Sequence, residues 1–241
     1  MDIKKNHIGD IVANDFRTAA IFKKNGIDFC CKGGRTIEDA CSNKNLNPET
    51  IYRAIEELPG QNSGTIDFNL FPLDLLADYV EKTHHRYAEE KIPIIMTFLE
   101  KLARVHGERH PELVEIRNLF AASVQDLSVH FKKEELILFP FIRNMVKAKI
   151  NQEELLAPAF GTVENPVAMM MDDHSIEGDR FAKIAELTSN YNPPADACNT
   201  YRVTFAMLKE FEEDLHTHIH IENNILFPKA IRLEQELVVP A

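Results

Sequence analysis

The stretch DLSVHFKKEELILFP, residues 126–140, belongs to a segment whose apolar residues recur with helical spacing. At two places on that apolar stripe the sequence carries His130 and Glu134 in place of leucine or isoleucine. Because these residues are four positions apart, they project from one helix face, one turn from each other. An ionised carboxylate is very costly to bury alone, so Glu134 requires a cation or a proton as its partner.

The same pattern occurs again in DLHTHIHIENNILFP, residues 214–228, at a constant offset of 88 positions. His218 and Glu222 therefore repeat the first pair, and we interpret the region as a duplicated helical hairpin. Imidazole and carboxylate together suit iron, manganese or zinc, and two such pairs facing each other across a bundle predict a metal site. The alternative is a duplicated structural network, which would have to bury four ionisable groups without a metal.

The other two arms of the duplicated hairpins should each supply a histidine. His174 lies on the apolar stripe of its segment, whereas the first arm offers both His84 and His85. Helical phase with the preceding apolar residues favours His84, and the internal repeat favours His85. We prefer the repeat as a guide because Pro93 is expected to kink that helix. Two metal ions bridged by carboxylates could then be held by His85, His130, Glu134, His174, His218 and Glu222.

Several polar residues near these positions have simpler interpretations. Asp126 and Asp214 precede the motif histidines by one turn, so we expect them to accept the free ring N–H and fix its tautomer. His216 and His220 fall off the apolar stripe and are expected to be exposed or to lie just outside the ligands. Helical core packing accounts better than metal binding for the methionines 169–171. We treat as surface residues His7, His106 and His110.

Glycine usage divides the chain into two regions, because six of the nine glycines fall within the first 64 residues. The stretch LPGQNSGT, residues 58–65, has the composition of a linker. We predict a small helical domain over residues 1–60, a linker over 61–66 and an antiparallel four-helix bundle over 67–241. No period-2 strand pattern is evident, so the predicted fold class is all-α. The predicted helices cover roughly 8–25, 35–43, 47–58, 72–106, 111–149, 166–189 and 194–236.

The bulk composition argues against several classes of function. The formal net charge is −11, and the whole deficit lies after residue 60. Such an acidic chain repels phosphate backbones, so nucleic acid is not an expected partner. No apolar run is long enough to span a membrane, and MDIKKNHIGD lacks the apolar core of a secretory signal. The four cysteines, two of them adjacent, do not indicate a disulfide framework, so we expect a reducing, cytoplasmic location.

The adjacent cysteines, Cys30 and Cys31, lie in the glycine-bracketed loop GIDFCCKGGR. They could be a packed structural pair. The functional interpretation is that the following glycines expose the thiols and that Lys32 and Arg35 lower their pKa. Such thiols could bind iron in transit, pass it on or carry a nitrosyl group, and the sequence leaves these roles open. Ordinary buried or partly buried thiols are expected at Cys41 and Cys198.

Residues 66–236 resemble a hemerythrin-like four-helix bundle. Residues 1–60, particularly IGDIVANDFRTAAIFKKNGIDFCCKGGRTIEDAC, resemble the short N-terminal domain of the di-iron repair-of-iron-centres proteins. The resemblance covers nearly the whole chain and implies a non-haem di-iron protein of the bacterial cytoplasm. Proteins of that family hold two oxo- and carboxylate-bridged irons with four histidines and two bridging glutamates. The residues that match are His85, His130, Glu134, His174, His218 and Glu222, and the family's paired cysteines match Cys30 and Cys31.

The resemblance implies that the protein helps to restore iron–sulfur clusters damaged by nitric oxide or peroxide. Our leading hypothesis is a protein that supplies iron to damaged iron–sulfur clusters or removes nitric oxide from them, with the iron donor preferred. Its expected partners are damaged iron–sulfur proteins and small ligands such as nitric oxide or oxygen. A second hypothesis is an enzyme, a di-iron reductase of nitric oxide or peroxide. A third is a binding protein, either a carrier or a sensor of oxygen or nitric oxide. A small domain on a linker also suggests a possible homodimer.

Overall fold

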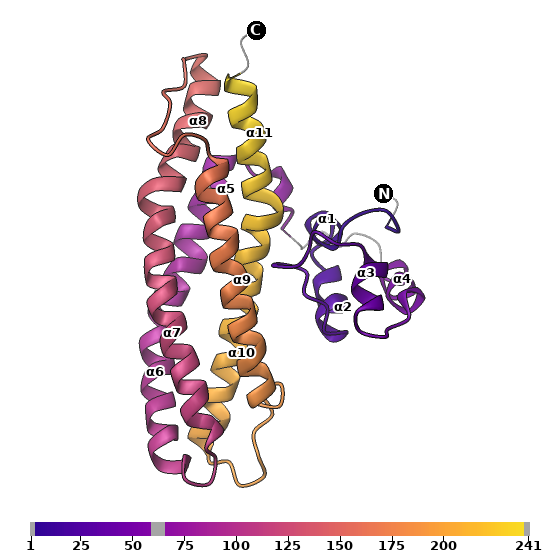
Figure 1. The fold of residues 1–241 in the computed structure, drawn as a ribbon, viewed down its shortest axis with the longest axis vertical. Coiled ribbons are helices and arrows are strands. Elements are labelled where there is room, and N and C mark those ends of the chain that lie inside the picture. The colour runs from indigo at the N-terminus through magenta and orange to yellow at the C-terminus, as the bar shows by residue number, and fades with distance from the viewer. Residues whose placement is uncertain (1–2, 59–65, 239–241) are drawn as a thin grey trace.

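The structure is a computed structural model that describes residues 3–58 and 66–238. Within these ranges the ordered elements are helices, and no strand occurs. Figure 1 shows long helical arms side by side, with a group of short helices against one side of them. The predicted fold class, a helical bundle preceded by a small helical domain, is confirmed. The predicted linker 61–66 lies, except for its last residue, outside the described residues.

The small domain is built from short helices, two of which begin at a capping residue. Thr36 and Asp39 form a capping box at the start of the third helix. Asn47 caps the fourth helix, in which Pro48 occupies the first position. The four helices are α1 (Ile8–Asn14), α2 (Thr18–Lys24), α3 (Ile37–Ser42) and α4 (Pro48–Glu56).

The prediction of one helix over 8–25 is wrong, because the helix is interrupted between α1 and α2. Asp15 is extended, with φ −146° and ψ 97°. Its Oδ1 accepts a hydrogen bond of 3.1 Å from the backbone N–H of Arg17, and the Thr18 hydroxyl donates to its carbonyl at 2.7 Å. These local side-chain bonds compete with helix formation, and the apolar spacing alone does not reveal them.

The bundle follows a single 3-10 turn, η1 (Phe68–Leu70). The first arm, 73–106, consists of α5 (Leu73–Tyr79), η2 (Val80–His85) and α6 (Arg86–His106). The second arm, 112–151, consists of α7 (Glu112–Lys133), η3 (Glu134–Leu138) and α8 (Phe139–Asn151). The third arm is α9 (Glu164–Leu187), and the fourth arm, 199–238, consists of α10 (Asn199–Ile221), η4 (Glu222–Leu226) and α11 (Phe227–Val238).

In the described ranges, the elements η2, η3 and η4 are π-helical turns that interrupt three of the four arms. Two of them begin at the motif glutamates, Glu134 and Glu222. In each of these two, the glutamate carbonyl accepts a hydrogen bond from the N–H five residues later, which widens the helix locally. Turns of this kind are frequent at functional sites. Pro93 lies inside α6, and the helix continues through it.

The apolar interior of the bundle divides into two clusters, and the division falls at the π-helical turns. We call the two clusters lower and upper, because α6 and α7 lie below α8 and α11 in Figure 1. In the second arm Phe131 belongs to the lower cluster, whereas Leu138 belongs to the upper one. In the fourth arm Ile219 and Ile221 are divided in the same way. The core of the small domain, which includes Phe22, is continuous with the lower cluster. A layer of polar residues therefore lies between two apolar regions.

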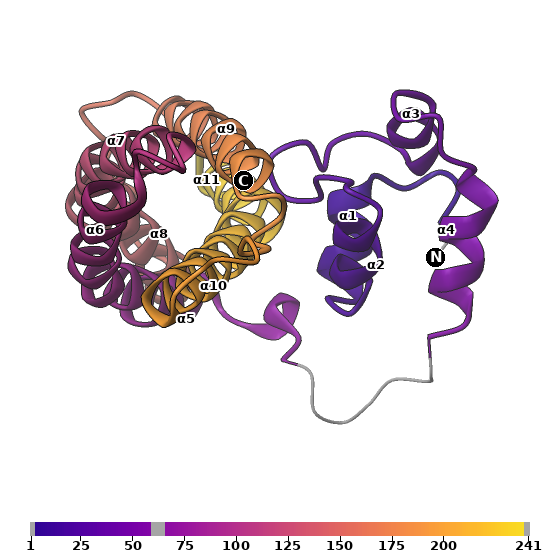
Figure 2. The same ribbon diagram turned by 90° about the horizontal axis from the view of Figure 1, so that it is seen from below.

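The small domain contacts the bundle through the loop between α2 and α3, which reaches α9 in the view of Figure 2. Lys32 in this loop pairs with Asp179 of α9 at 3.0 Å. Gly178 makes room for the loop, because a Cβ atom there would meet the Cys31 sulfur at 2.9 Å. Among the described residues, no helix combines the length and apolar character needed to cross a bilayer.

Candidate metal centre

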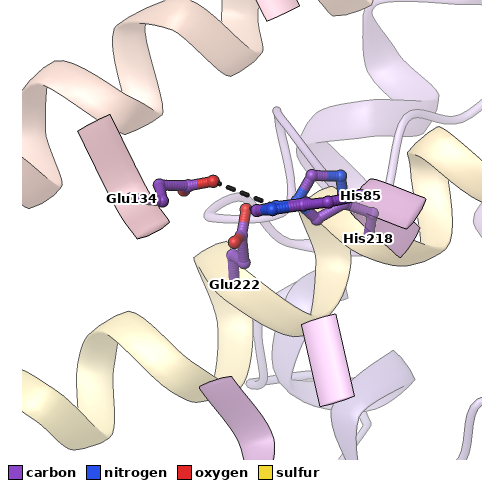
Figure 3. Close-up of side chains that lie close together, drawn as sticks. All are labelled: His85, Glu134, His218 and Glu222. Atoms are coloured by element: carbon purple, nitrogen blue, oxygen red, sulfur yellow. Dashed lines mark ion pairs between the residues drawn. The ribbon is translucent and has the colours of Figure 1, made fainter. Parts of the chain in front are cut away.

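The polar layer contains all six side chains that the sequence predicts as metal ligands, and they come from all four arms. They form two groups in which the potential ligand atoms lie within 4.8 Å of one another. Glu134 and Glu222 belong to both groups. Figure 3 shows the group with His85 and His218, whose side chains converge on the two glutamates. The other group contains His130 and His174 with the same two glutamates.

The glutamate oxygens and the inward nitrogens of His85 and His218 are buried without a hydrogen-bond partner. Glu134 and Glu222 are 0% exposed, and none of their carboxylate oxygens has a hydrogen-bond partner. The inward ring atoms Nε2 of His85 and His218 lie 3.3 and 3.0 Å from these carboxylates, but without hydrogen-bond geometry. A buried charged acceptor left in this state costs more than about 1–3 kcal/mol. The arrangement therefore fits a cation between the groups.

The histidines of the second group direct their inward nitrogens at each other. The Nε2 atoms of His130 and His174 lie 3.1 Å apart. Two nitrogens bound at about 2.1 Å to one ion, at right angles, would be about 3.0 Å apart. The two rings therefore present their nitrogens as neighbouring ligands of one ion would.

Three of these histidines are held by a partner on the outer ring nitrogen, Nδ1. Such a contact fixes the ring orientation and leaves Nε2 as the atom that faces inward. The Nδ1 contacts are His85 with Glu135 at 2.9 Å, His130 with Asp173 at 3.2 Å and His174 with Asn223 at 2.8 Å.

The prediction that Asp126 and Asp214 hold the motif histidines is wrong. Asp126 accepts a hydrogen bond from Arg180 at 2.6 Å, and Asp214 contacts Nδ1 of His84 at 2.9 Å. The outer nitrogen of a core histidine reaches a neighbouring arm, whereas a residue one turn away stays on its own helix. The internal repeat could have indicated two of the true partners, because Glu135 and Asn223 each directly follow a motif glutamate and are 88 positions apart.

The structure brings His85, and not His84, into the group with both glutamates. The reason is the π-helical turn η2 that contains both histidines. In an α-helix the face of Val80 recurs four residues later, at His84, but in a π-helical turn it recurs five residues later, at His85. Helical phase therefore pointed to the wrong residue by one position.

Burial sets the charge state of this layer. It lowers the pKa of His85 to about 2 and that of His130 to about 4, so both rings are neutral at pH 7 with a lone pair available. Burial, with Glu222 close by, raises the pKa of Glu134. Hydrogen bonding to His130, helped by Lys133, lowers the pKa of Asp173 to about 2. The outer carboxylate of Asp173 is therefore ionised, whereas Glu134 needs a cation to ionise fully. Glu222 differs, because its contacts with His218 and His174 outweigh burial and lower its pKa.

The paired cysteines lie close to this layer, but their environment differs from the predicted one. Cys30 is 4% exposed, and hydrogen bonding to Cys31 together with burial raises its pKa. Lys32 pairs with Asp179 instead of activating a thiol. The Cys31 thiol donates to the backbone carbonyl of His174 at 3.2 Å. The prediction of an exposed, activated thiolate at Cys30 is therefore wrong, because the loop docks on the bundle.

Two further histidines that the sequence placed outside the site line this docking surface. His220 is 1% exposed, and burial lowers its pKa to about 4. Its ring lies edge-on to Phe29 of the loop, and His216 contacts the same ring. Of the two alternatives expected for His220, exposure does not hold, because the small domain covers that face of α10.

The remaining predictions have mixed outcomes. Met170 is 1% exposed, as core packing requires, but Met169 and Met171 are exposed. Cys41 is buried as expected, whereas Cys198 is exposed and lies 3.4 Å from Nε2 of His106. Of the histidines treated as surface residues, His7 is exposed, whereas His106 and His110 are partly exposed.

Comparison with known proteins gives a consistent result over both regions. A family model described as Hemerythrin HHE cation binding domain matches residues 77–230. One described as Domain of Unknown function (DUF542) matches residues 4–59. The chain is 31% identical to the iron-sulfur cluster repair protein ScdA of Staphylococcus haemolyticus, over 92% of this chain and 96% of that protein.

Relatives in other bacteria have similar coverage. The iron-sulfur cluster repair protein YtfE of Musicola paradisiaca is 31% identical, over 97% of this chain and 100% of its own length. YtfE of Yersinia pestis is 30% identical over the same shares. A cation-binding bundle with a small N-terminal domain is thus shared along nearly the whole length of these proteins. The chain belongs to the hemerythrin-like family that includes the iron-sulfur cluster repair proteins ScdA and YtfE.

Proposed function

We propose that the polar layer holds two non-haem iron ions bridged by the two glutamates and an oxo group. One ion would be bound by His85 and His218 and the other by His130 and His174. The observation that carries this proposal is that both candidate ligand groups share both glutamates, with no carboxylate oxygen satisfied by the protein. The mixed imidazole and carboxylate set suits iron, which supplies redox chemistry and an exchangeable coordination position.

We further propose that the chain repairs iron–sulfur clusters damaged by nitric oxide or peroxide, acting as an iron donor in the bacterial cytoplasm. The relatives that match over nearly their full length are named for cluster repair. In this proposal iron is the cargo and damaged iron–sulfur proteins are the partners. The buried store lies next to a loop with two free thiols, which are the groups that a cluster protein also uses to bind iron.

A cavity beside the polar layer favours a second candidate function, the binding or reduction of nitric oxide or oxygen. It has a volume of about 220 Å³, and its walls include the candidate ligands His130, His174 and His218. A diatomic ligand fits such a space and would reach the metal from there. Turnover of nitric oxide with a chemical reductant would support the enzyme, and binding without turnover would support the carrier or sensor.

The metal proposal is tested by the metal content and optical spectrum of natively purified protein. We expect about two irons per chain with near-ultraviolet absorption, and loss of both in the Glu134→Ala, Glu222→Ala double variant. A matched control is the double variant of two exposed glutamates, Glu90→Ala and Glu154→Ala. A single zinc in the wild-type protein would contradict the proposal. So would a wild type without metal, if both double variants keep the fold.

The donor role is tested by transfer of iron to an apo iron–sulfur protein. We expect the Cys30→Ala, Cys31→Ala variant to transfer iron more slowly than the wild type at equal iron content. The Cys41→Ala, Cys198→Ala variant removes the same number of thiols and should transfer normally. An unchanged transfer rate after loss of Cys30 and Cys31 would show that the paired thiols take no part.

A further inference from the structure

A second set of potential metal ligands lies outside the polar layer, in the loop between α2 and α3. It consists of Asp28, Cys30 and Cys31. The Cys30 sulfur lies 3.8 Å from the Cys31 sulfur and 3.4 Å from Oδ1 of Asp28. A tetrahedral ion with sulfur at about 2.3 Å and carboxylate oxygen at about 2.0 Å would set these distances at about 3.8 and 3.5 Å. These two distances match those expected for ligands of one ion, and all three ligand atoms lie within 4.8 Å of one another.

The backbone holds this spacing in place. Oδ1 of Asp28 accepts hydrogen bonds from the N–H groups of Cys30 at 3.0 Å and Cys31 at 2.9 Å. This turn is closed by an aspartate side chain, and it brings the carboxylate and both thiols together. Because the turn depends on Oδ1 and not on the charge, an asparagine at position 28 would keep the turn and weaken the ligand.

The site is also fixed relative to the polar layer. The Cys31 thiol donates to the carbonyl of His174, and the Asn223 side chain joins Nδ1 of His174 to the carbonyl of Cys30, at 2.8 and 3.4 Å. The residue that offers Nε2 to the polar layer therefore contacts the cysteine loop directly. No long chain of residues separates the two sets of ligands.

Access to the loop comes from two sides. A cavity of about 510 Å³ is bounded by Asp28 and Cys30, and another of about 330 Å³ by Cys30 and Cys31. Three protein ligands leave one position of a tetrahedral ion open, and such open positions are where exchange takes place. A thiol or carboxylate of another molecule could occupy it through either cavity.

We propose that Asp28, Cys30 and Cys31 form a mononuclear site for a divalent cation, with the fourth position open to an exchanging ligand. Both thiols lose their protons when the ion binds, so one ion displaces two protons and no electron is transferred. Thiolate with carboxylate suits zinc, cobalt or ferrous iron. That the ion is iron on its way out of the bundle rests on the proposed function, whereas the site itself does not.

The test uses Co²⁺ as a probe, added to the full-length protein already loaded with iron. We expect one further Co²⁺ per chain, with thiolate-to-cobalt charge-transfer absorption. The Cys30→Ser, Cys31→Ser variant should lose this absorption, and Asp28→Asn should weaken Co²⁺ binding by about tenfold or more. The Cys41→Ser, Cys198→Ser variant should bind as the wild type does.

Two outcomes would overturn the site. One is the absence of thiolate-to-cobalt absorption in the iron-loaded wild type, and the other is unchanged Co²⁺ affinity in Asp28→Asn with a folded protein by circular dichroism. Failure of the iron proposal gives a different result. If Glu134→Ala, Glu222→Ala keeps its iron but the thiolate absorption is present and sensitive to Asp28→Asn, the loop site stands and only the bundle proposal fails.

Discussion

The two hairpins of the bundle, 73–151 and 164–238, carry the same motif but differ in the residue after the motif glutamate. In the first hairpin Glu135 contacts His85 and also pairs with Arg86 at 2.6 Å. At the equivalent place in the second hairpin, Asn223 contacts His174 and donates to the carbonyl of Cys30. The outer contact of the first hairpin is thus an ion pair within the bundle, and that of the second is a hydrogen bond to the small domain.

The chemistry of the two side chains explains this difference. A carboxylate only accepts hydrogen bonds, so it suits a histidine on one side and an arginine on the other. An amide accepts with its oxygen and donates with its nitrogen, so it can join a ring N–H to a backbone carbonyl. The duplicated hairpins therefore keep the same inward-facing residues, while the outer contacts follow what each hairpin packs against.

The largest expected difference is between replacing a glutamate that belongs to both ligand groups and replacing a histidine that belongs to only one. Because Glu222 belongs to both ligand groups, Glu222→Gln is expected to reduce bound iron from about two per chain to near zero. His174 belongs to one group, so His174→Ala should keep about one iron per chain. Metal analysis of both variants decides this. Equal retention of iron would show that the two positions are filled independently of the shared carboxylates.

The outer contact of the second hairpin is tested by Asn223→Asp. A carboxylate cannot donate to the carbonyl of Cys30, so the loop loses its bond at a cost of about 1–3 kcal/mol. We expect the Cys31 thiol to react with an alkylating reagent about tenfold faster or more. Glu135→Gln is the matched control, because the same position in the first hairpin does not contact the loop. Equal alkylation rates in wild type and Asn223→Asp would contradict the coupling.

The outer contact of the first hairpin is tested by the same Glu135→Gln variant. Its neutral amide holds the His85 ring less firmly and removes the ion pair of Arg86 with Glu135, while Arg86 keeps its pair with Glu89. We expect iron to be removed by a chelator about tenfold faster than in wild type, with thiol reactivity unchanged. Removal at the wild-type rate would mean that Glu135 does not support the ring.

The smallest expected effect concerns Asp173, which holds His130 from the third arm. Its pKa in the folded protein is about 2, below the usual 3.8, so its ionised form stabilises the fold at pH values above about 4. That contribution is lost as the pH falls toward 2. Urea unfolding of metal-free wild type and Asp173→Asn should therefore differ most at pH 5 and converge near pH 2. A constant difference across this range would rule out the charge of Asp173 as the cause.

The fold class, and five of the six side chains that meet in the polar layer, could be predicted from the amino-acid sequence alone, and for the sixth the sequence offered His84 and His85. Helical periodicity records which face of each arm is buried, so His130 and Glu134 stand out on an apolar stripe. The internal repeat then indicates which buried faces meet, because duplicated hairpins pack symmetrically. Both signals depend only on the spacing of residues along the chain, so they can be read without knowing the tertiary structure.

The contacts around those side chains could not be predicted from the sequence and follow from the packing of the arms and the small domain. The π-helical turn before His85 changes the helical phase by one residue, and no periodicity shows where it occurs. The outer partners of the histidines come from neighbouring arms, and the environment of Cys30 comes from docking on α9. Each of these depends on residues that are distant in sequence and adjacent only after packing. Hydrogen bonds and burial at such contacts are properties of the folded arrangement.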